Sequence, residues 1–98
     1  MNMPDKIKIG GMIYTVEEKA DEVRDNRRSG CSNGNAQTII IDKDITKQFK
    51  ESTFIHEVLH QIDFIYNIEL DHKQVFLLET GIFAFLKDNP NIFVKDEV

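Results

Sequence analysis

The residues most suited to chemistry are His56-Glu57-Val58-Leu59-His60, an H-E-x-x-H pattern. Two histidines four residues apart lie one turn above each other on a helix, so both imidazoles can bind one ion at about 2.0–2.1 Å. Glu57 directly follows the first histidine and is placed to accept a proton from a water molecule on the ion. The pattern predicts a zinc site with His56 and His60 as ligands and Glu57 as the general base.

A glutamate further along the chain, Glu79, falls in the centre of an otherwise apolar helical face. Burying an unpaired carboxylate is costly, so a glutamate there needs a cation nearby. Two histidines and one glutamate with an open fourth position are the ligand set of a catalytic zinc site. We therefore expect Glu79 to be the third ligand; the alternatives are a side chain that reaches solvent or pairs with a lysine. The apolar residues of this face are Val75, Phe76, Ile82, Phe83 and Leu86.

Several further residues have weaker claims to the site. Asp63 lies one turn past His60, where it can accept a hydrogen bond from a ligand imidazole or remain a solvated side chain. Gly81 is expected to let its helix approach its neighbour, so that Glu79 reaches the ion. Asp63 or His72 would replace Glu79 if Glu79 is not a ligand. Candidates to stabilise an oxyanion, none of them positioned by the sequence, are His72, Tyr14 and Tyr66.

The motif requires a helix, and apolar periodicity predicts one from about residue 47 to 66. Ile55, Leu59, Ile62 and Tyr66 recur at helical spacing, and the preceding Asp44 or Thr46 can cap the first turn. A connection over residues 67–71 leads to a second helix over about residues 72–88, which Asn89-Pro90 ends.

The first half of the chain reads as two β-hairpins. Residues 6–17 flank Gly10-Gly11, and a second pair of strands, 29–33 and 36–42, flanks the turn Asn33-Gly34-Asn35. Residues 18–28 suit a loop or a short helix, and residues 91–98 a terminal strand or a loose tail. We predict an α+β fold, in which two helices carrying the metal site pack on one face of a small antiparallel sheet.

Composition limits the possible partners and compartments. The 98 residues suit one domain, 1–98, and a net charge of −5 with scattered basic residues argues against nucleic acid. The single Cys31 fits a reducing compartment and is more often a small packed side chain than a ligand. We see no secretory signal and no apolar stretch near the roughly 20 residues that span a bilayer. The sequence therefore predicts a cytoplasmic protein with no membrane partner.

The motif followed by a later glutamate resembles the gluzincin arrangement of zinc peptidases. Within that group, Glu79-x-x-x-Phe83-Ala84 is similar to the glutamate helix of the ImmA/IrrE-type metallopeptidases, and the chain looks like the small zincin-like proteins of bacteria and their phages. The resemblance implies that His56, His60 and Glu79 bind zinc and that Glu57 is the base. Larger members carry extra helices and often a separate regulatory or DNA-binding domain, neither of which is expected within these 98 residues.

The leading expectation is zinc-dependent hydrolysis of a peptide bond in a protein or peptide substrate. Glu57 would take a proton from the zinc-activated water and return it to the leaving amine. By analogy, the strand over about residues 37–42 would align an extended substrate if it lies at the sheet edge beside the cleft. The alternatives are a non-catalytic, zinc-stabilised protein-binding or regulatory module, in which Glu57 has no necessary role, and a metal-free structural domain, in which the buried Glu79 has no explanation.

Overall fold

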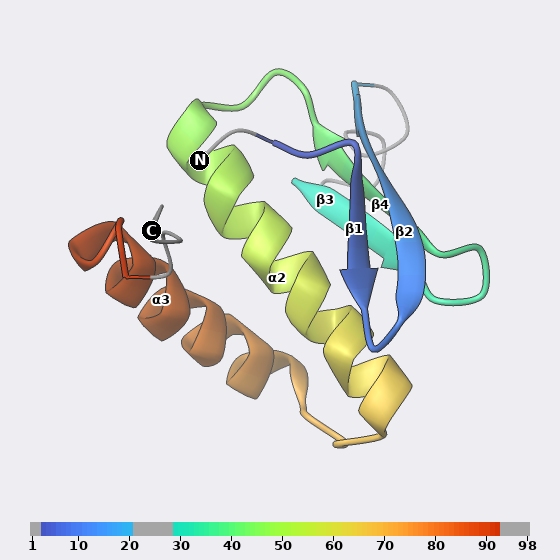
Figure 1. Cartoon of the computed structure of the whole chain (residues 1–98). Coiled ribbons are helices and arrows are strands. Elements are labelled where there is room, and N and C mark those ends of the chain that lie inside the picture. Colours follow the sequence, from blue (N-terminus) through green and yellow to red (C-terminus); the bar gives the residue numbers. More distant parts are fainter. Residues whose placement is uncertain (1–2, 21–28, 93–98) are drawn as a thin grey trace, which may run out of the picture.

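The computed structural model describes residues 3–20 and 29–92, and it confirms the α+β fold class. A four-stranded sheet lies on one side of helix α2, and helix α3 lies on the other side (Figure 1). Most of residues 18–28 and most of residues 91–98 lie outside the described residues, and so do most of the expectations for these two segments. The elements are β1 Lys6–Ile9, β2 Met12–Lys19, β3 Gly30–Asn33, β4 Thr38–Asp42, α2 Lys47–Tyr66 and α3 His72–Asp88.

The first hairpin forms where the two glycines predict it. Gly10 and Gly11 have φ angles of 57° and 83°, a left-handed backbone that glycine adopts without steric cost. Strands β1 and β2 therefore pair antiparallel, with Ile9 opposite Met12 beside the turn.

The second hairpin also forms, but the sheet that results is mixed rather than wholly antiparallel. Strands β3 and β4 pair antiparallel, whereas β2 and β4 pair parallel, which gives the order β1-β2-β4-β3. The strand over residues 37–42 does not lie at the sheet edge, so the condition for its role in aligning a substrate is not met. Ile39 and Ile41 of β4 have no exposed surface, as suits a central strand, and β3 forms the edge instead.

Helix α2 has the bounds that the sequence predicts, and its caps explain them. Thr46 is the N-cap, because its hydroxyl oxygen accepts a hydrogen bond from the Phe49 amide at 3.1 Å. Asn67, with a φ angle of 53°, ends the helix in the left-handed region.

The apolar stripe of α2 divides between two hydrophobic clusters. Ile55 and Leu59 pack with Val75 of α3, which is fully buried. The α2 residues that pack against the core of the sheet are Phe54, Val58, Ile62 and Ile65. Since both of its sides are covered, α2 is the central element of the fold and fixes the position of any group that it carries.

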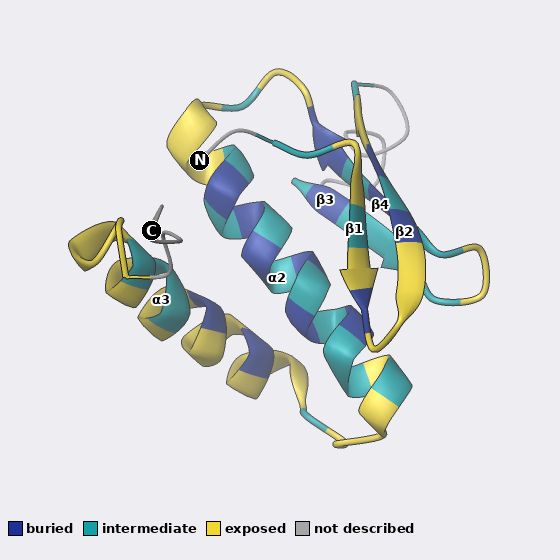
Figure 2. Cartoon of the chain, viewed as in Figure 1, coloured by how far each residue is buried: buried dark blue, intermediate teal, exposed yellow. Residues whose placement is uncertain are grey.

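Helix α3 packs on α2, on the side away from the sheet (Figure 1). Its N-terminus is a capping box, in which Asp71 accepts from the Gln74 amide and Gln74 accepts from the Asp71 amide. Phe76, predicted for the inward face, is 57% exposed, because that face centres on Val75 and Glu79. Much of the outer side of α3 is exposed (Figure 2).

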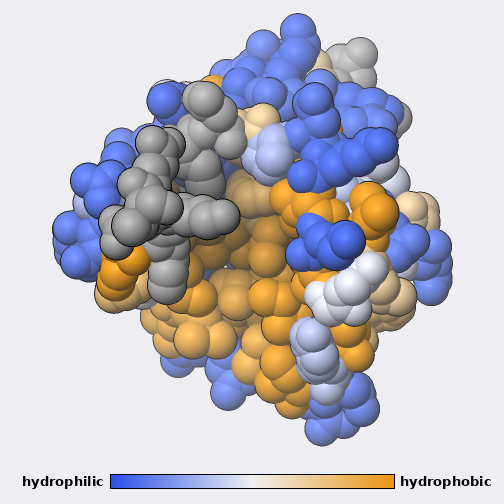
Figure 3. All heavy atoms as spheres, in the orientation of Figure 1, coloured by the Kyte–Doolittle hydropathy of each residue, from blue (hydrophilic) through white to orange (hydrophobic). Residues whose placement is uncertain are grey.

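Apolar side chains also gather on the face of the molecule seen in Figure 3, over the middle of the helical layer.

Among the described residues, no helix is both long enough and apolar enough to cross a membrane.

Candidate metal centre

The three histidines of the chain come together between α2 and α3. Each of His56, His60 and His72 offers a ring nitrogen, and these atoms lie within 4.8 Å of one another. The two motif histidines are the closer pair: their ring centroids are 4.7 Å apart, and their Nε2 atoms are 3.0 Å apart. The helical spacing of the motif therefore does bring both imidazoles to one point.

His56 and His60 fit a metal ion by geometry, and His60 also fits it by charge state. Two nitrogens bound to a tetrahedral zinc at about 2.0–2.1 Å lie roughly 3.3 Å apart, close to the observed separation of the His56 and His60 Nε2 atoms. Burial lowers the pKa of His60 below its usual 6.5, with Glu57 and Asp63 opposing the shift. A neutral imidazole near pH 7 is the form that binds metal.

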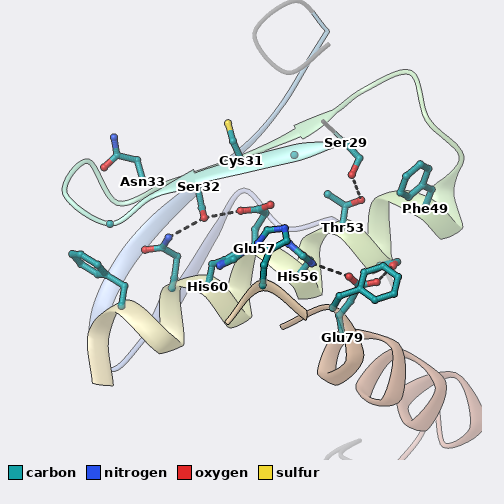
Figure 4. A pocket seen from close by; sticks show the side chains of 17 residues that line it. Ser29, Cys31, Ser32, Asn33, Phe49, Thr53, His56, Glu57, His60 and Glu79 are labelled. Atoms are coloured by element: carbon teal, nitrogen blue, oxygen red, sulfur yellow. Dashed lines mark hydrogen bonds and ion pairs between the residues drawn. The ribbon is translucent and has the colours of Figure 1, made fainter. Parts of the chain in front are cut away.

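Glu79 is buried, with 8% of its surface exposed, as the apolar face around it predicted. Its Oε1 atom lies 2.9 Å from Nδ1 of His56, and its Oε2 atom accepts a hydrogen bond from the Ser52 hydroxyl at 2.5 Å (Figure 4). The partners are thus a histidine and a serine, rather than solvent or a lysine. The carboxylate contacts the nitrogen of His56 that is not directed at His60.

Gly81 does not have the role expected of it. A Cβ atom built on Gly81 would meet no atom within 4 Å, apart from its chain neighbours and its own helix backbone, so close approach of the two helices does not depend on this glycine. The position of Glu79 on the inward face is enough to bring its carboxylate to His56.

Glu57, the candidate base, is 6% exposed and is held by a chain of hydrogen bonds from the sheet. The Ser32 hydroxyl donates to Oε1 of Glu57 at 2.7 Å, and the Gln61 amide donates to the Ser32 hydroxyl at 2.8 Å. The Tyr14 hydroxyl in turn donates to Oε1 of Gln61 at 2.9 Å. Burial raises the pKa of Tyr14 above 10, so the phenol keeps the proton that it donates.

The hydrogen-bond chain from Tyr14 through Gln61 and Ser32 to Glu57 was not predicted from the sequence. Gln61 carries a usable signal, since it lies one turn after Glu57 and takes a buried position on a helix whose other buried residues include Ile55 and Leu59. Nothing in the sequence assigns Ser32 to Glu57, because their contact depends on how β3 lies over α2. Tyr14 contributes to the site only through this chain.

A cleft of about 1020 Å³ runs between β3, α2 and the start of α3, and the three histidines line it (Figure 4). Gly30 allows the edge strand to lie close to α2 at one end of this cleft. A Cβ atom at Gly30 would lie 2.6 Å from Cγ2 of Thr53 and 3.0 Å from the Ile40 carbonyl oxygen, so any side chain would displace the strand.

Two other candidates from the sequence, Asp63 and Tyr66, are not among the residues that line the cleft. Asp63 accepts hydrogen bonds from the amides of Glu69 and Leu70 at 2.7 and 3.2 Å, so it braces the loop between the two helices. Tyr66 ends α2 and is 61% exposed. Cys31 lies on β3 and is partly buried, as expected of a packed thiol.

Comparisons with protein-family models, with curated proteins and with solved structures gave no match to this chain.

Proposed function

We propose that this protein is a small zinc-dependent peptidase of the gluzincin type, similar to the ImmA/IrrE-type metallopeptidases. One observation carries the proposal: the buried carboxylate of Glu57 adjoins two histidines whose Nε2 atoms are 3.0 Å apart, inside an open cleft. His56 and His60 would bind the ion. Glu79, predicted from the sequence as the third ligand, supports the site through the nitrogen of His56 that it contacts.

In this proposal, Glu57 is the general base and then the general acid. A zinc ion at the histidines would supply Lewis-acid activation of a water molecule and of the scissile carbonyl. Glu57 takes the proton of that water and gives it to the leaving amine. The Ser32 hydroxyl occupies one lone pair of Oε1, which fixes the rotamer of Glu57 while its other oxygen remains available for the proton.

The substrate is best understood as an extended segment of a peptide or protein. Among the described strands, β3 pairs on one side only, with β4, and it borders the cleft. An exposed strand edge binds an extended chain through backbone hydrogen bonds. We therefore assign to β3 the substrate-aligning role that the sequence analysis gave to the following strand.

A second candidate function is a non-catalytic, zinc-stabilised module that binds a partner protein. Its support is the small core, since the described side chains that are almost completely buried and large are only Tyr14, Ile39, Ile41 and Val75. A domain with a core of this size gains from a bound metal. This alternative keeps the histidines as ligands but gives Glu57 no task, so Glu57 separates the two functions.

The test compares Glu57→Gln with Glu51→Gln, a matched change on the same helix. Glu51 is 7% exposed and Glu57 is 6% exposed, so both variants neutralise a carboxylate of equal burial. Each protein, loaded with zinc, is incubated with a diverse peptide library, and cleavage is read by mass spectrometry with a chelator control. Glu57→Gln should lose about 10²–10⁴-fold in rate and keep its zinc, whereas Glu51→Gln should still cleave.

Cleavage that persists in Glu57→Gln would rule out Glu57 as the base. If zinc-loaded wild type cuts no peptide, hydrolysis is abandoned in favour of the binding module.

A further inference from the structure

The third histidine of the chain has no role in the reaction proposed above, yet it lies beside the other two. The ring centroid of His72 is 5.4 Å from that of His56 and 5.3 Å from that of His60, and those two are 4.7 Å apart. The three rings thus form a nearly equilateral triangle. Because the chain has only three histidines, their meeting from two separate helices points to a shared ligand.

The backbone that carries His72 is fixed from both directions. Asp71, immediately before it, is the N-cap of α3 and forms the capping box with Gln74. On α2, Asp63 binds the amides of Glu69 and Leu70 in the preceding loop. This bracing starts the helix at a point where the first side chain faces the motif histidines.

Glu79 contacts the other side of the site. Its Oε1 atom is 2.9 Å from Nδ1 of His56, while Nε2 of the same ring lies 3.0 Å from Nε2 of His60. A histidine that binds a metal through one nitrogen commonly donates the other N–H to a carboxylate, which fixes the ring and its tautomer. The position of Glu79 matches that of a carboxylate that holds a metal-binding histidine without binding the metal.

We propose that His72 is the third protein ligand of the ion, and that Glu79 holds His56 in place from outside the coordination shell. The inference rests on the metal centre of the proposed function. It replaces the gluzincin ligand set of two histidines and a glutamate, which the sequence predicts, with three histidines. Three imidazoles around zinc leave the fourth position open for water, so the site remains suited to hydrolysis.

The required movement is small. The nitrogens are at most 4.8 Å apart, and ligands of a tetrahedral zinc lie roughly 3.3 Å apart, so closure needs at most about 1.5 Å. The side chain of His72 is exposed and is the only one of the three not partly buried, so it can turn toward the ion without disturbing the core.

The direct test counts the histidines bound to the metal. Protein labelled with ¹⁵N-histidine is loaded with ¹¹³Cd²⁺, and the splitting of each imidazole nitrogen signal by the metal is recorded. Splitting at three histidines is expected, and the third signal should disappear in His72→Ala. Splitting at only two would overturn the proposal, while leaving the metal centre and the proposed peptidase intact. Absence of any bound cadmium or zinc would overturn both.

Affinity measurements provide a second readout that needs no substrate. His72→Ala should weaken zinc binding by more than the 10–100-fold typical of an outer-shell partner, and Glu79→Gln should weaken it by about 10–100-fold with three split signals retained. Lys73→Ala, the exposed neighbour in the same helical turn, is the matched control and should bind as wild type does. Equal zinc affinity of His72→Ala and Lys73→Ala would contradict the assignment.

Discussion

The two helices distribute their residues in opposite ways. Helix α2 buries four polar residues beside Ile55 and Leu59, whereas α3 buries only Val75 and Glu79. On α3, large apolar side chains lie at the surface instead, and Figure 2 shows that much of this helix is exposed. The buried polar residues of α2 are Glu51, Thr53, Glu57 and Gln61, and the exposed apolar residues of α3 include Phe76, Leu77, Leu78 and Phe85.

The buried polar residues of α2 help to position the site, whereas the exposed apolar residues of α3 only form part of the surface. A buried polar group is costly unless it is hydrogen-bonded, and among the described residues no buried side-chain nitrogen or oxygen lacks a partner. The polar residues of α2 are therefore positioned by directional bonds. The outer apolar residues of α3 have no such constraint, so their identity matters less to the fold.

The largest expected effect is that of the ion, because it would give α3 a second attachment to α2. Zinc at about 100 times its dissociation constant should add about 2.7 kcal/mol to the free energy of unfolding, which raises the Tm by roughly 10–20 °C. His56→Ala and His60→Ala should lose this gain, because each removes a ligand. Thermal unfolding with and without zinc, followed by circular dichroism, measures it.

The control is the exposed variant Lys73→Ala, which should keep the full zinc-dependent rise in Tm. An equal rise in wild type and both histidine variants would place the zinc elsewhere and remove the proposed link between the helices.

The next effect concerns a buried polar residue, where a more apolar side chain should destabilise the protein. Gln61→Leu keeps a similar side-chain volume but removes the acceptor of the Tyr14 hydroxyl. Tyr14 has no exposed surface, so water cannot replace that acceptor. An unsatisfied buried donor costs about 1–3 kcal/mol, and urea unfolding should show a loss in this range.

The double variant Tyr14→Phe, Gln61→Leu tests the cause of that loss. Removing both partners should recover part of the stability, since no donor is then left unsatisfied. Losses that simply add would show that the Tyr14–Gln61 bond contributes nothing.

Local signals were enough to predict most of the fold. The glycine pair, the helical periodicity and the cap at Thr46 all act over a few residues, so the sequence contains them directly. The order of the strands in the sheet does not depend on such local signals. Parallel pairing of β2 with β4 joins Val16 to Ile39 across a long connection, and no local pattern in either strand indicates it.

The candidate site likewise has some features that the sequence predicts and others that it does not. The spacing of His56 and His60 predicts their convergence, and the apolar face around Glu79 predicts its burial. Which nitrogen Glu79 contacts depends on the packing of two helices, and the approach of His72 depends on the loop that Asp63 braces. These tertiary features have no periodic signature in the sequence.

The smallest expected effect is the counterpart of Gln61→Leu, a change from apolar to polar on α3. Leu77 is 56% exposed in the middle of that helix, and glutamine has nearly the helix propensity of leucine. Leu77→Gln should therefore change the free energy of unfolding by no more than about 0.5 kcal/mol. This effect is smaller than that of Gln61→Leu, although Leu77→Gln makes the chain less apolar and Gln61→Leu makes it more apolar. Urea unfolding at two protein concentrations measures the change in the free energy of unfolding and its dependence on concentration.

A loss above about 1 kcal/mol at either concentration would show that the outer face of α3 is buried in solution. A loss that grows with concentration would show that a second copy of the chain covers this face. A small and concentration-independent change would establish that the polar residues buried on α2 determine the structure more strictly than the apolar residues exposed on α3.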